Sequence, residues 1–371
     1  MFISTSSTGW KNTQTNKDKS EVSHQPGRTR KIVNRLLQLL IIAVLLYLVF
    51  YRHGEELLEN LKLVGVKGLA VLIVLAAAYQ ALDAAGCLIL IRRRLPTFTF
   101  RQSVELTELG FFFQITTMSV GSVPAQGAYL RNRGLMMGDG LGLMAMNYVI
   151  HKSAVLLAAI PLLAATGWQI AIDNPALRSL LLVGTLLFTL LIGGMVLICT
   201  WEPMHRLACH LLSLLPKTEV WQGRKETLLR NLDALREESR DVWHHPHETV
   251  CALLLHAVKH LWVAFVPAVC LALMHVKVPL LQTMQLAVLC QVISGAIPNV
   301  AGLGPAEFSF LLLFSTCLEP AQAASALVLY RCVTYFLPFL ASLLVTKGVA
   351  GRVQCQRKRK NAYEETKKER S

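Results

Sequence analysis

The stretch GSVP at residues 121–124 has a counterpart in the second half of the chain, GAIP at residues 295–298, and both lie within apolar sequence. Glycine and proline together interrupt a helix, because proline lacks an N–H and clashes with the preceding turn while glycine frees the backbone. At membrane depth, interrupted backbone is tolerated only where protein buries it or where it lines a wet cavity. A matched pair of breaks therefore indicates a transport site at the interface of two repeats.

The composition is that of an integral membrane protein. Of the 371 residues, 53% are hydrophobic and 16% are charged, and the mean hydropathy is +0.46. Soluble domains carry about 25% charged residues. The one extended polar loop, residues 202–248, is too short for an ordinary catalytic domain of roughly 100 residues. We therefore expect the function to be located in the membrane or at its surface.

The net charge of +14 does not indicate a nucleic-acid partner. Lysine and arginine are concentrated in the two tails and in the Arg92–Arg94 loop, as expected for cytoplasmic flanks that face anionic lipid. The nine cysteines lie mostly in apolar segments without C-x-x-C spacing, so neither a disulfide framework nor a zinc site is expected. The tract His244–His247 is interpreted as part of a solvated loop, and we expect no metal and no cofactor.

Six stretches approach the length of about 20 apolar residues that a bilayer-spanning helix needs. They are Leu36–Tyr51, Leu69–Ile91, Leu141–Ala165, Leu180–Thr200, Val250–Met274 and Ala323–Val345. Two further apolar segments, Val104–Pro124 and Leu281–Leu318, contain the breaks. We predict an all-α integral membrane protein with about six full transmembrane helices and two re-entrant broken-helix hairpins.

The distribution of positive charge predicts the topology. If each broken segment returns to the side from which it enters, both tails, the Arg92–Arg94 loop and the 202–248 loop face the cytoplasm. If instead Val104–Pro124 crossed completely and Leu281–Leu318 crossed as two spans, the basic cluster Arg357–Lys360 would lie outside. The first hairpin then enters from the cytoplasm and the second from outside, so the hairpins are oppositely oriented in an inverted repeat.

The predicted domain organisation follows from this topology. A disordered cytoplasmic tail (1–31) precedes a single transmembrane domain (32–350) with halves at about 32–177 and 178–350, and a basic cytoplasmic tail (351–371) follows. The 202–248 loop is expected to contain an amphipathic helix with Leu228, Leu232 and Leu235 on one face, lying on the inner membrane surface.

Ionisable residues in apolar spans are energetically unfavourable and are therefore candidate functional residues. The candidates for substrate contact are Asp83, Arg131, His151, Lys152, Glu307 and Arg331, together with the residues of the broken-helix motifs, Gly121, Pro124, Gly127, Gly295, Pro298, Gly302 and Gly304. His256, Lys259 and His260 share one face of a span by their spacing. Glu105 and Glu108 are interpreted as interfacial.

Two interpretations of the buried charges remain open. They could form a polar cavity that passes a charged group. Alternatively they could form internal ion pairs, such as Asp83 or Glu307 with Lys152 or Arg331, that only lock helices together. No G-x-S-x-G elbow and no nucleotide fingerprint is present, so no catalytic constellation is indicated.

Three stretches carry a resemblance to a known family. Pro124–Arg131 is similar to P-x-x-G-E-x-x-R, Pro298–Glu307 to P-G-G-x-G-x-x-E, and Arg331–Pro338 to R-x-x-T-x-x-L-P. From about residue 35 to 350 the chain resembles the transmembrane region of lysylphosphatidylglycerol synthases, a flippase-like family of bacterial and archaeal membrane proteins. It departs from the family pattern at Ala128, where the motif has an acidic residue, and in the two residues between Pro298 and Ala301.

The resemblance implies a stand-alone member of this family. Complete members carry a soluble aminoacyltransferase domain after the membrane part, and that domain supplies the enzyme activity. No such domain is recognised here, so lysyl transfer is not expected.

The resulting hypothesis is a transporter in the cell membrane, with both termini cytoplasmic, that moves a phospholipid or a lipid-linked polar head group between leaflets. Arg131, Lys152 and Arg331 would contact a phosphate, and Glu307 an amine or one of these cations. Anionic lipids at the basic tails and a homo-oligomeric state are further expectations. The alternatives are an accessory membrane subunit for a separate soluble lipid-modifying enzyme, and a membrane-embedded lipid transferase with Glu307 or His151 as base.

Overall fold

The computed structural model describes most of the membrane domain predicted from the sequence. The described residues are 62, 64–117, 121–164, 175–213, 229, 232–233, 235–242, 244–297 and 304–352. The N-terminal tail, the predicted span Leu36–Tyr51 and residues 353–371 lie outside them. Within the described ranges the regular structure is helical, with no strand, which confirms the predicted all-α class.

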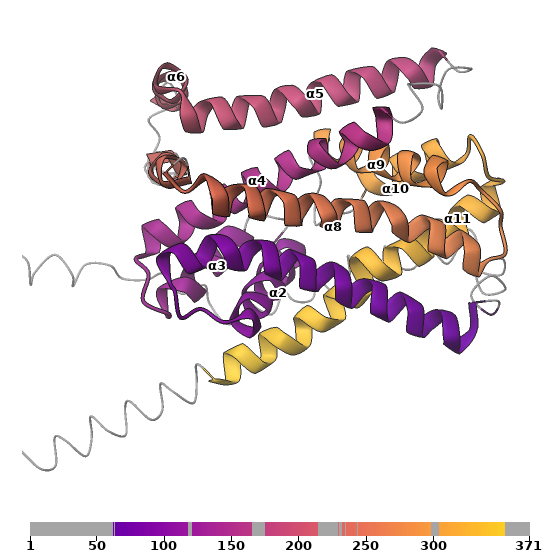
Figure 1. Cartoon of the computed structure of the whole chain (residues 1–371), viewed down its shortest axis with the longest axis horizontal. Coiled ribbons are helices and arrows are strands. Elements are labelled where there is room, and N and C mark those ends of the chain that lie inside the picture. Colours follow the sequence, from indigo (N-terminus) through magenta and orange to yellow (C-terminus); the bar gives the residue numbers. More distant parts are fainter. Residues whose placement is uncertain are drawn as a thin grey trace, which may run out of the picture. The chain divides into compact units, whose positions relative to one another are not determined.

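Five described helices are long and apolar enough to cross a membrane (Figure 1). They are Val64–Arg94, α4 (Met137–Ala164), α5 (Pro175–Thr200, with its apolar part at Leu181–Thr200), α8 (Pro246–Leu273) and Pro320–Arg352. The last contains α11 (Pro320–Arg331) and a π-helical turn, η2 (Cys332–Phe336). These helices coincide with five of the six predicted spans.

Four shorter helices form two matched pairs. α2 (Phe100–Thr116) and α9 (Leu280–Ala296) have 17 residues each, while α3 (Ser122–Arg131) and α10 (Pro305–Phe314) have 10 each. α2 packs against α3, and α9 packs against α10. Each pair stands between two long helices in the chain, so the same order of helix lengths occurs twice. The helices are thus broken where the sequence predicted.

The first break is stabilised by Thr117, which directly follows α2. Its hydroxyl donates to the carbonyl oxygen of Phe113 at 2.5 Å and accepts from the N–H of Gly121 at 2.6 Å. A Cβ at Gly121 would lie 2.5 Å from the Thr117 hydroxyl oxygen, so a side chain there would clash. Pro124 lies in the first turn of α3, where a missing N–H leaves no helix hydrogen bond unmade.

The second break is stabilised by Glu307. Residues 298–303, with the predicted motif residues Pro298 and Gly302, lie outside the described residues. Gly304 caps α10 with φ +97°, a backbone conformation that favours glycine, and its N–H donates to Glu307 Oε2 at 2.6 Å. Gly295 allows α9 to pack closely against α5, because a Cβ there would lie 2.6 Å from the Phe188 ring of α5.

The buried apolar residues form two cores. The first-hairpin core contains residues of the second half of the Val64–Arg94 helix, of α2, of α3 and of the first half of α4, together with Val242 and Ala252. The second-hairpin core contains residues of the first half of the Val64–Arg94 helix, of the second halves of α4 and α8, and of α5, α9, α10 and α11. Each broken pair of helices therefore packs into its own core.

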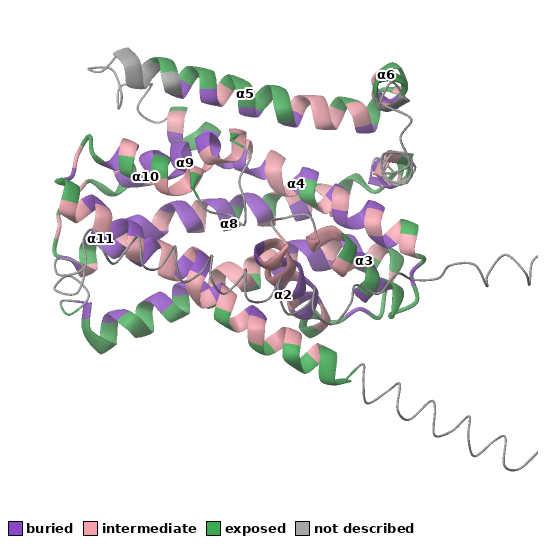
Figure 2. Ribbon diagram, turned by 180° about the vertical axis from the view of Figure 1, so that it is seen from behind, coloured by how far each residue is buried: buried purple, intermediate pink, exposed green. Residues whose placement is uncertain are grey.

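Apolar side chains also cover the outside of the long helices. Exposed residues line much of α5 in Figure 2, and they include Leu186 at 59% and Leu190 at 62% exposure. Soluble monomers rarely expose apolar surface on this scale, whereas lipid tails solvate it. The chain is a multi-pass membrane protein.

The polar 202–248 loop contains helical structure that packs on the membrane helices. α6 (Glu202–Ser213) is followed by helical residues at 235–242, of which Leu235 and Val242 contact the first-hairpin core. Leu228 lies outside the described residues. Placement of this region on the inner membrane surface stays a prediction.

Candidate functional site

Three long helices pass from one core to the other, and each carries ionisable residues at the crossover. On the Val64–Arg94 helix, Asp83 lies between Ala76 of the second-hairpin core and Cys87 of the first-hairpin core. α4 and α8, both 28 residues long, carry theirs near the middle. We call the residues at the three crossovers the polar layer: Asp83, His151, Lys152, His256, Lys259 and His260.

Lys259 is the centre of the polar layer and is only 1% exposed. Its Nζ donates to Asp83 Oδ1 at 2.6 Å and to His151 Nδ1 at 2.7 Å, and lies 5.6 Å from the centre of the Tyr79 ring. An ammonium group has donors only, so His151 accepts through Nδ1 and carries its proton on Nε2. The Asp83 carboxylate compensates the buried positive charge.

Two further histidines extend the polar layer along α8. His256 Nε2 lies 3.2 Å from Asn147 Oδ1, and His260 Nδ1 lies 2.7 Å from Gln291 Oε1 of α9. Of the other ring nitrogens, His256 Nδ1 lies 3.7 Å from Asp83 Oδ1, beyond hydrogen-bond distance, and His260 Nε2 is buried without a hydrogen-bond partner among the described residues. Buried polar atoms are normally paired. The layer therefore has capacity to bind a further polar group.

Glu307 and Arg331 form a second charged site. Arg331 Nη2 lies 2.5 Å from Glu307 Oε1, and the arginine side chain is 11% exposed. The π-helical turn η2 follows Arg331 directly, and π-bulges are frequent at functional sites. The Arg331 guanidinium lies 5.7 Å from the Tyr335 ring, whose centre is 6.3 Å from that of Phe111 in α2. This group of residues therefore connects parts of both broken pairs.

The structure brings together some of the predicted site residues and separates others. Asp83 and His151 meet through Lys259, and Glu307 pairs with Arg331, one of the ion pairs considered from the sequence. Arg131 is exposed at the last turn of α3. Lys152 Nζ lies 5.5 Å from the Tyr148 ring on its own helix. Asp83 pairs with Lys259, and not with Lys152 or Arg331, the two partners considered from the sequence.

Sequence reasoning missed the neutral members of the site. Tyr79 and Asn147 lack the charge that marked the other residues, yet each precedes a predicted site residue by four positions and so shares its helix face. Gln291 carried no comparable signal. Glu105 and Glu108, interpreted as interfacial, are buried within the protein at 7% and 4% exposure.

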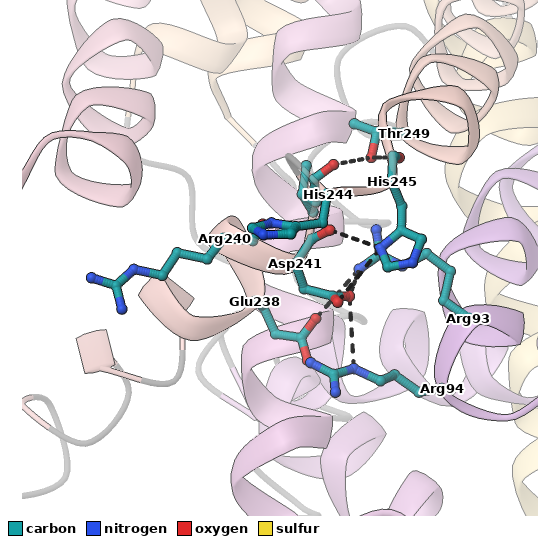
Figure 3. Close-up of polar contacts among 9 residues, drawn as sticks. Arg93, Arg94, Glu238, Arg240, Asp241, His244, His245 and Thr249 are labelled. Carbon is teal, nitrogen blue, oxygen red and sulfur yellow. Dashed lines mark hydrogen bonds and ion pairs between the residues drawn. The ribbon is translucent and has the colours of Figure 1, made fainter.

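A separate ion network attaches the 235–242 helix to the end of the Val64–Arg94 helix (Figure 3). Arg93 Nη2 lies 2.7 Å from Asp241 Oδ2, and Arg94 Nη2 lies 2.9 Å from Glu238 Oε1. Burial raises the pKa of the Glu238 carboxyl, and the negative charge of Asp241 acts in the same direction, while Arg94 and Arg93 oppose the shift. His245 Nδ1 lies 3.0 Å from the Asp241 backbone oxygen. The network therefore holds the 235–242 helix against the end of the Val64–Arg94 helix.

Among the described residues, two groups of side chains have metal-ligand chemistry. Asp83, His151 and His256 each offer an atom within 4.8 Å of the others, and so do His205, Cys209 and Asp233. In the first group the Lys259 ammonium already contacts Asp83 and His151. In the second, Arg236 Nη1 lies 3.4 Å from His205 Nδ1. The donors of both groups thus contact a cationic side chain of the protein itself.

The fold and the polar layer define a helical membrane protein with charged residues between two apolar cores and a broken pair of helices in each core. The chain belongs to the family described as the lysylphosphatidylglycerol synthase TM region, which matches residues 35–342. This membership confirms the resemblance and connects the protein with lipid handling. No curated protein and no solved structure matches the chain.

Proposed function

We propose that this protein translocates a phospholipid, or a lipid-linked polar head group, between the leaflets of the cell membrane. The observation that carries the proposal is the polar layer, in which charged residues lie near the middle of two long helices and His260 Nε2 is buried without a hydrogen-bond partner among the described residues. Charged residues at membrane depth mark substrate or ion pathways. Transporters built from repeats bind their substrates near the bilayer midplane.

In the proposed mechanism the head group crosses the polar layer while the acyl chains stay in the bilayer. The ion pair between Arg331 and Glu307 opens, and the Arg331 guanidinium contacts the phosphate of the substrate. Glu307 can then contact an amine of the substrate. The ion pair forms again after the head group has passed. Lys152 and Arg131 offer further cationic contacts. The helix starts of α3 and α10 add N–H groups directed at an anion. The two broken pairs would act as re-entrant hairpins from opposite sides.

The proposed topology places both termini, the Arg92–Arg94 loop and the 202–248 loop in the cytoplasm. Protease treatment of right-side-out and inverted vesicles tests it, using epitope tags at each end of the chain. Cleavage of either tag in right-side-out vesicles would contradict the arrangement.

The function is tested by reconstituting the purified protein with a fluorescent phospholipid and measuring how fast a membrane-impermeant quencher bleaches it. Glu307→Gln keeps an oxygen for the Gly304 N–H and removes the charge, while Arg331→Ala removes the cation. We expect both to slow translocation by about tenfold or more, since each removes a charge-assisted contact. The exposed Lys347→Gln serves as the matched control. Parent-like rates in both variants would count decisively against the proposal.

The same preparation separates the alternatives. Chemical conversion of the labelled lipid by purified protein would indicate a membrane-embedded transferase. Co-purification of a soluble enzyme, with no lipid movement by this chain alone, would indicate an accessory subunit.

A further inference from the structure

A cavity of about 400 Å³ lies between α2, α3 and the end of the Pro320–Arg352 helix. No residue of the polar layer lines it. Small-molecule sites have volumes of roughly 300–1,000 Å³, so the cavity has room for a ligand the size of a lipid head group. Its wall has a charged part, with Glu105, Arg133 and Arg352, and an apolar part, with Phe113 and Val349.

The charged part of the wall selects for an anion. Glu105 is contacted by Arg352 at 2.7 Å and by the Tyr129 hydroxyl at 2.9 Å, with Arg133 at 3.8 Å. Each guanidinium has five N–H donors, and these contacts use few of them. The side chains of Arg133 and Arg352 are 36% and 47% exposed, so their remaining donors are accessible. Two arginines against one carboxylate leave a net positive charge.

The apolar part of the wall is suited to a ligand that also carries a hydrocarbon portion. Leu109 and Phe113 of α2 and Val349 of the last helix face the cavity beside the arginines. Guanidinium groups match phosphate oxygens in charge and in geometry. A free phosphate would use the arginines alone, whereas a phospholipid uses both parts of the wall.

We infer that this cavity binds the phosphate group of an anionic phospholipid, with Arg133 and Arg352 on the phosphate and the first part of the acyl chains along Phe113 and Val349. Arg133 follows the C-terminal end of α3, and Arg352 ends the last long helix. The site therefore connects the first broken pair with the second half of the chain. It binds lipid whether or not the polar layer translocates it.

Equilibrium binding to the full-length protein in detergent tests the inference. The probe is radiolabelled short-chain phosphatidylglycerol, with unlabelled short-chain phosphatidylcholine and inorganic phosphate as competitors. We expect phosphatidylcholine to compete about tenfold more weakly, because it keeps the phosphate but adds a choline cation that the two arginines repel, and phosphate more weakly still. Equal competition by phosphatidylcholine would overturn the selection for an anion. Competition by phosphate as strong as that of the labelled lipid would show that free phosphate is the ligand.

Variants locate the binding in the cavity. Arg133→Gln and Arg352→Gln should each weaken binding about tenfold. Ala128→Glu should abolish it by placing a carboxylate at the wall, and since Ala128 is exposed this change leaves the packing intact. Lys347→Gln, which removes an exposed charge from the same last helix outside the cavity, should bind as the parent does.

Parent-like affinity in both arginine variants and in Ala128→Glu would overturn the inference. Gel filtration and circular dichroism establish that each variant is folded. Because binding is measured without translocation, a protein that binds phosphatidylglycerol but moves no lipid would overturn the proposed function and leave this inference standing.

Discussion

Replacing Lys259 with methionine tests whether the polar layer is held by charge. Methionine keeps the length and the apolar packing of the side chain but leaves the Asp83 carboxylate without its ammonium partner at 2.6 Å. Removing one partner of a buried ion pair destabilises a protein by roughly 3–5 kcal/mol. The Asp83 side chain is 32% exposed, so water recovers part of this loss. We therefore expect Lys259→Met to destabilise the fold by about 2–3 kcal/mol.

Asp83→Asn should destabilise the fold more than Lys259→Met does. It leaves the Lys259 ammonium without a counter-charge, and the lysine side chain is only 2% exposed. The double variant contains neither charge, and its loss should be smaller than the sum of the single losses by about 1–3 kcal/mol.

The assay is thermal melting of the detergent-purified protein, followed by fluorescence-detected size exclusion. The expected change corresponds to a shift of several degrees, and the exposed Lys347→Met should melt like the parent. Strictly additive losses in the double variant, or a parent-like melt for Lys259→Met, would refute the argument that this ion pair organises the interior.

Three further changes test local features of the fold. Gly304→Ala should lower stability by about 1–2 kcal/mol in a melting experiment, since φ +97° is strained for alanine; an unchanged melt would contradict this. Gly121→Ala should also destabilise, and Thr117→Ala should rescue part of that loss by removing the atom 2.5 Å from the new Cβ. Because burial raises the pKa of Glu238, its contribution to stability is full below the ordinary glutamate pKa of 4.5 and declines as the pH rises through the raised value. The melting temperature of Glu238→Gln should therefore fall less steeply than that of the parent as the pH rises above 4.5. A pH profile identical to that of the parent would exclude this role.

The sequence was sufficient for the parts of the fold that depend on local signals. Long apolar runs predicted the helices, and the glycine and proline pattern predicted both breaks. Contacts between distant segments left no such signal. Arg93 and Asp241 are 148 positions apart, and the balanced charges of the 202–248 loop gave no hint that its acidic residues pair with Arg93 and Arg94.

The candidate site shows the same limit. Asp83, His151 and Lys259 stood out because charge is unfavourable in an apolar span, but Lys259 lies 176 positions from Asp83, and no periodicity specifies a partner at that distance. Neutral partners such as Gln291 were missed because a glutamine in an apolar helix is a weaker signal than a charge.

α8 connects the two halves of the molecule through contacts of different strength. Lys259 contacts the Val64–Arg94 helix and α4 through charged groups at 2.6 and 2.7 Å, whereas His260 contacts Gln291 of α9 through neutral groups at 2.7 and 3.2 Å. Hydrogen bonds that involve an ionised group are roughly twice as strong as neutral ones. If translocation requires one half to move against the other, the neutral contact is the one that separates.

We therefore expect α8 to stay with α4 and to move relative to α9 when lipid is transported. Spin labels at exposed positions measure this by double electron–electron resonance, with Val258 on α8, Tyr148 on α4 and Leu281 on α9. The 258–148 distance should stay constant when substrate lipid is added, while the 258–281 distance should change or broaden. A 258–148 distance that changes while 258–281 stays fixed would mean that the Lys259–His151 contact opens instead, and would contradict the expectation that α8 stays with α4.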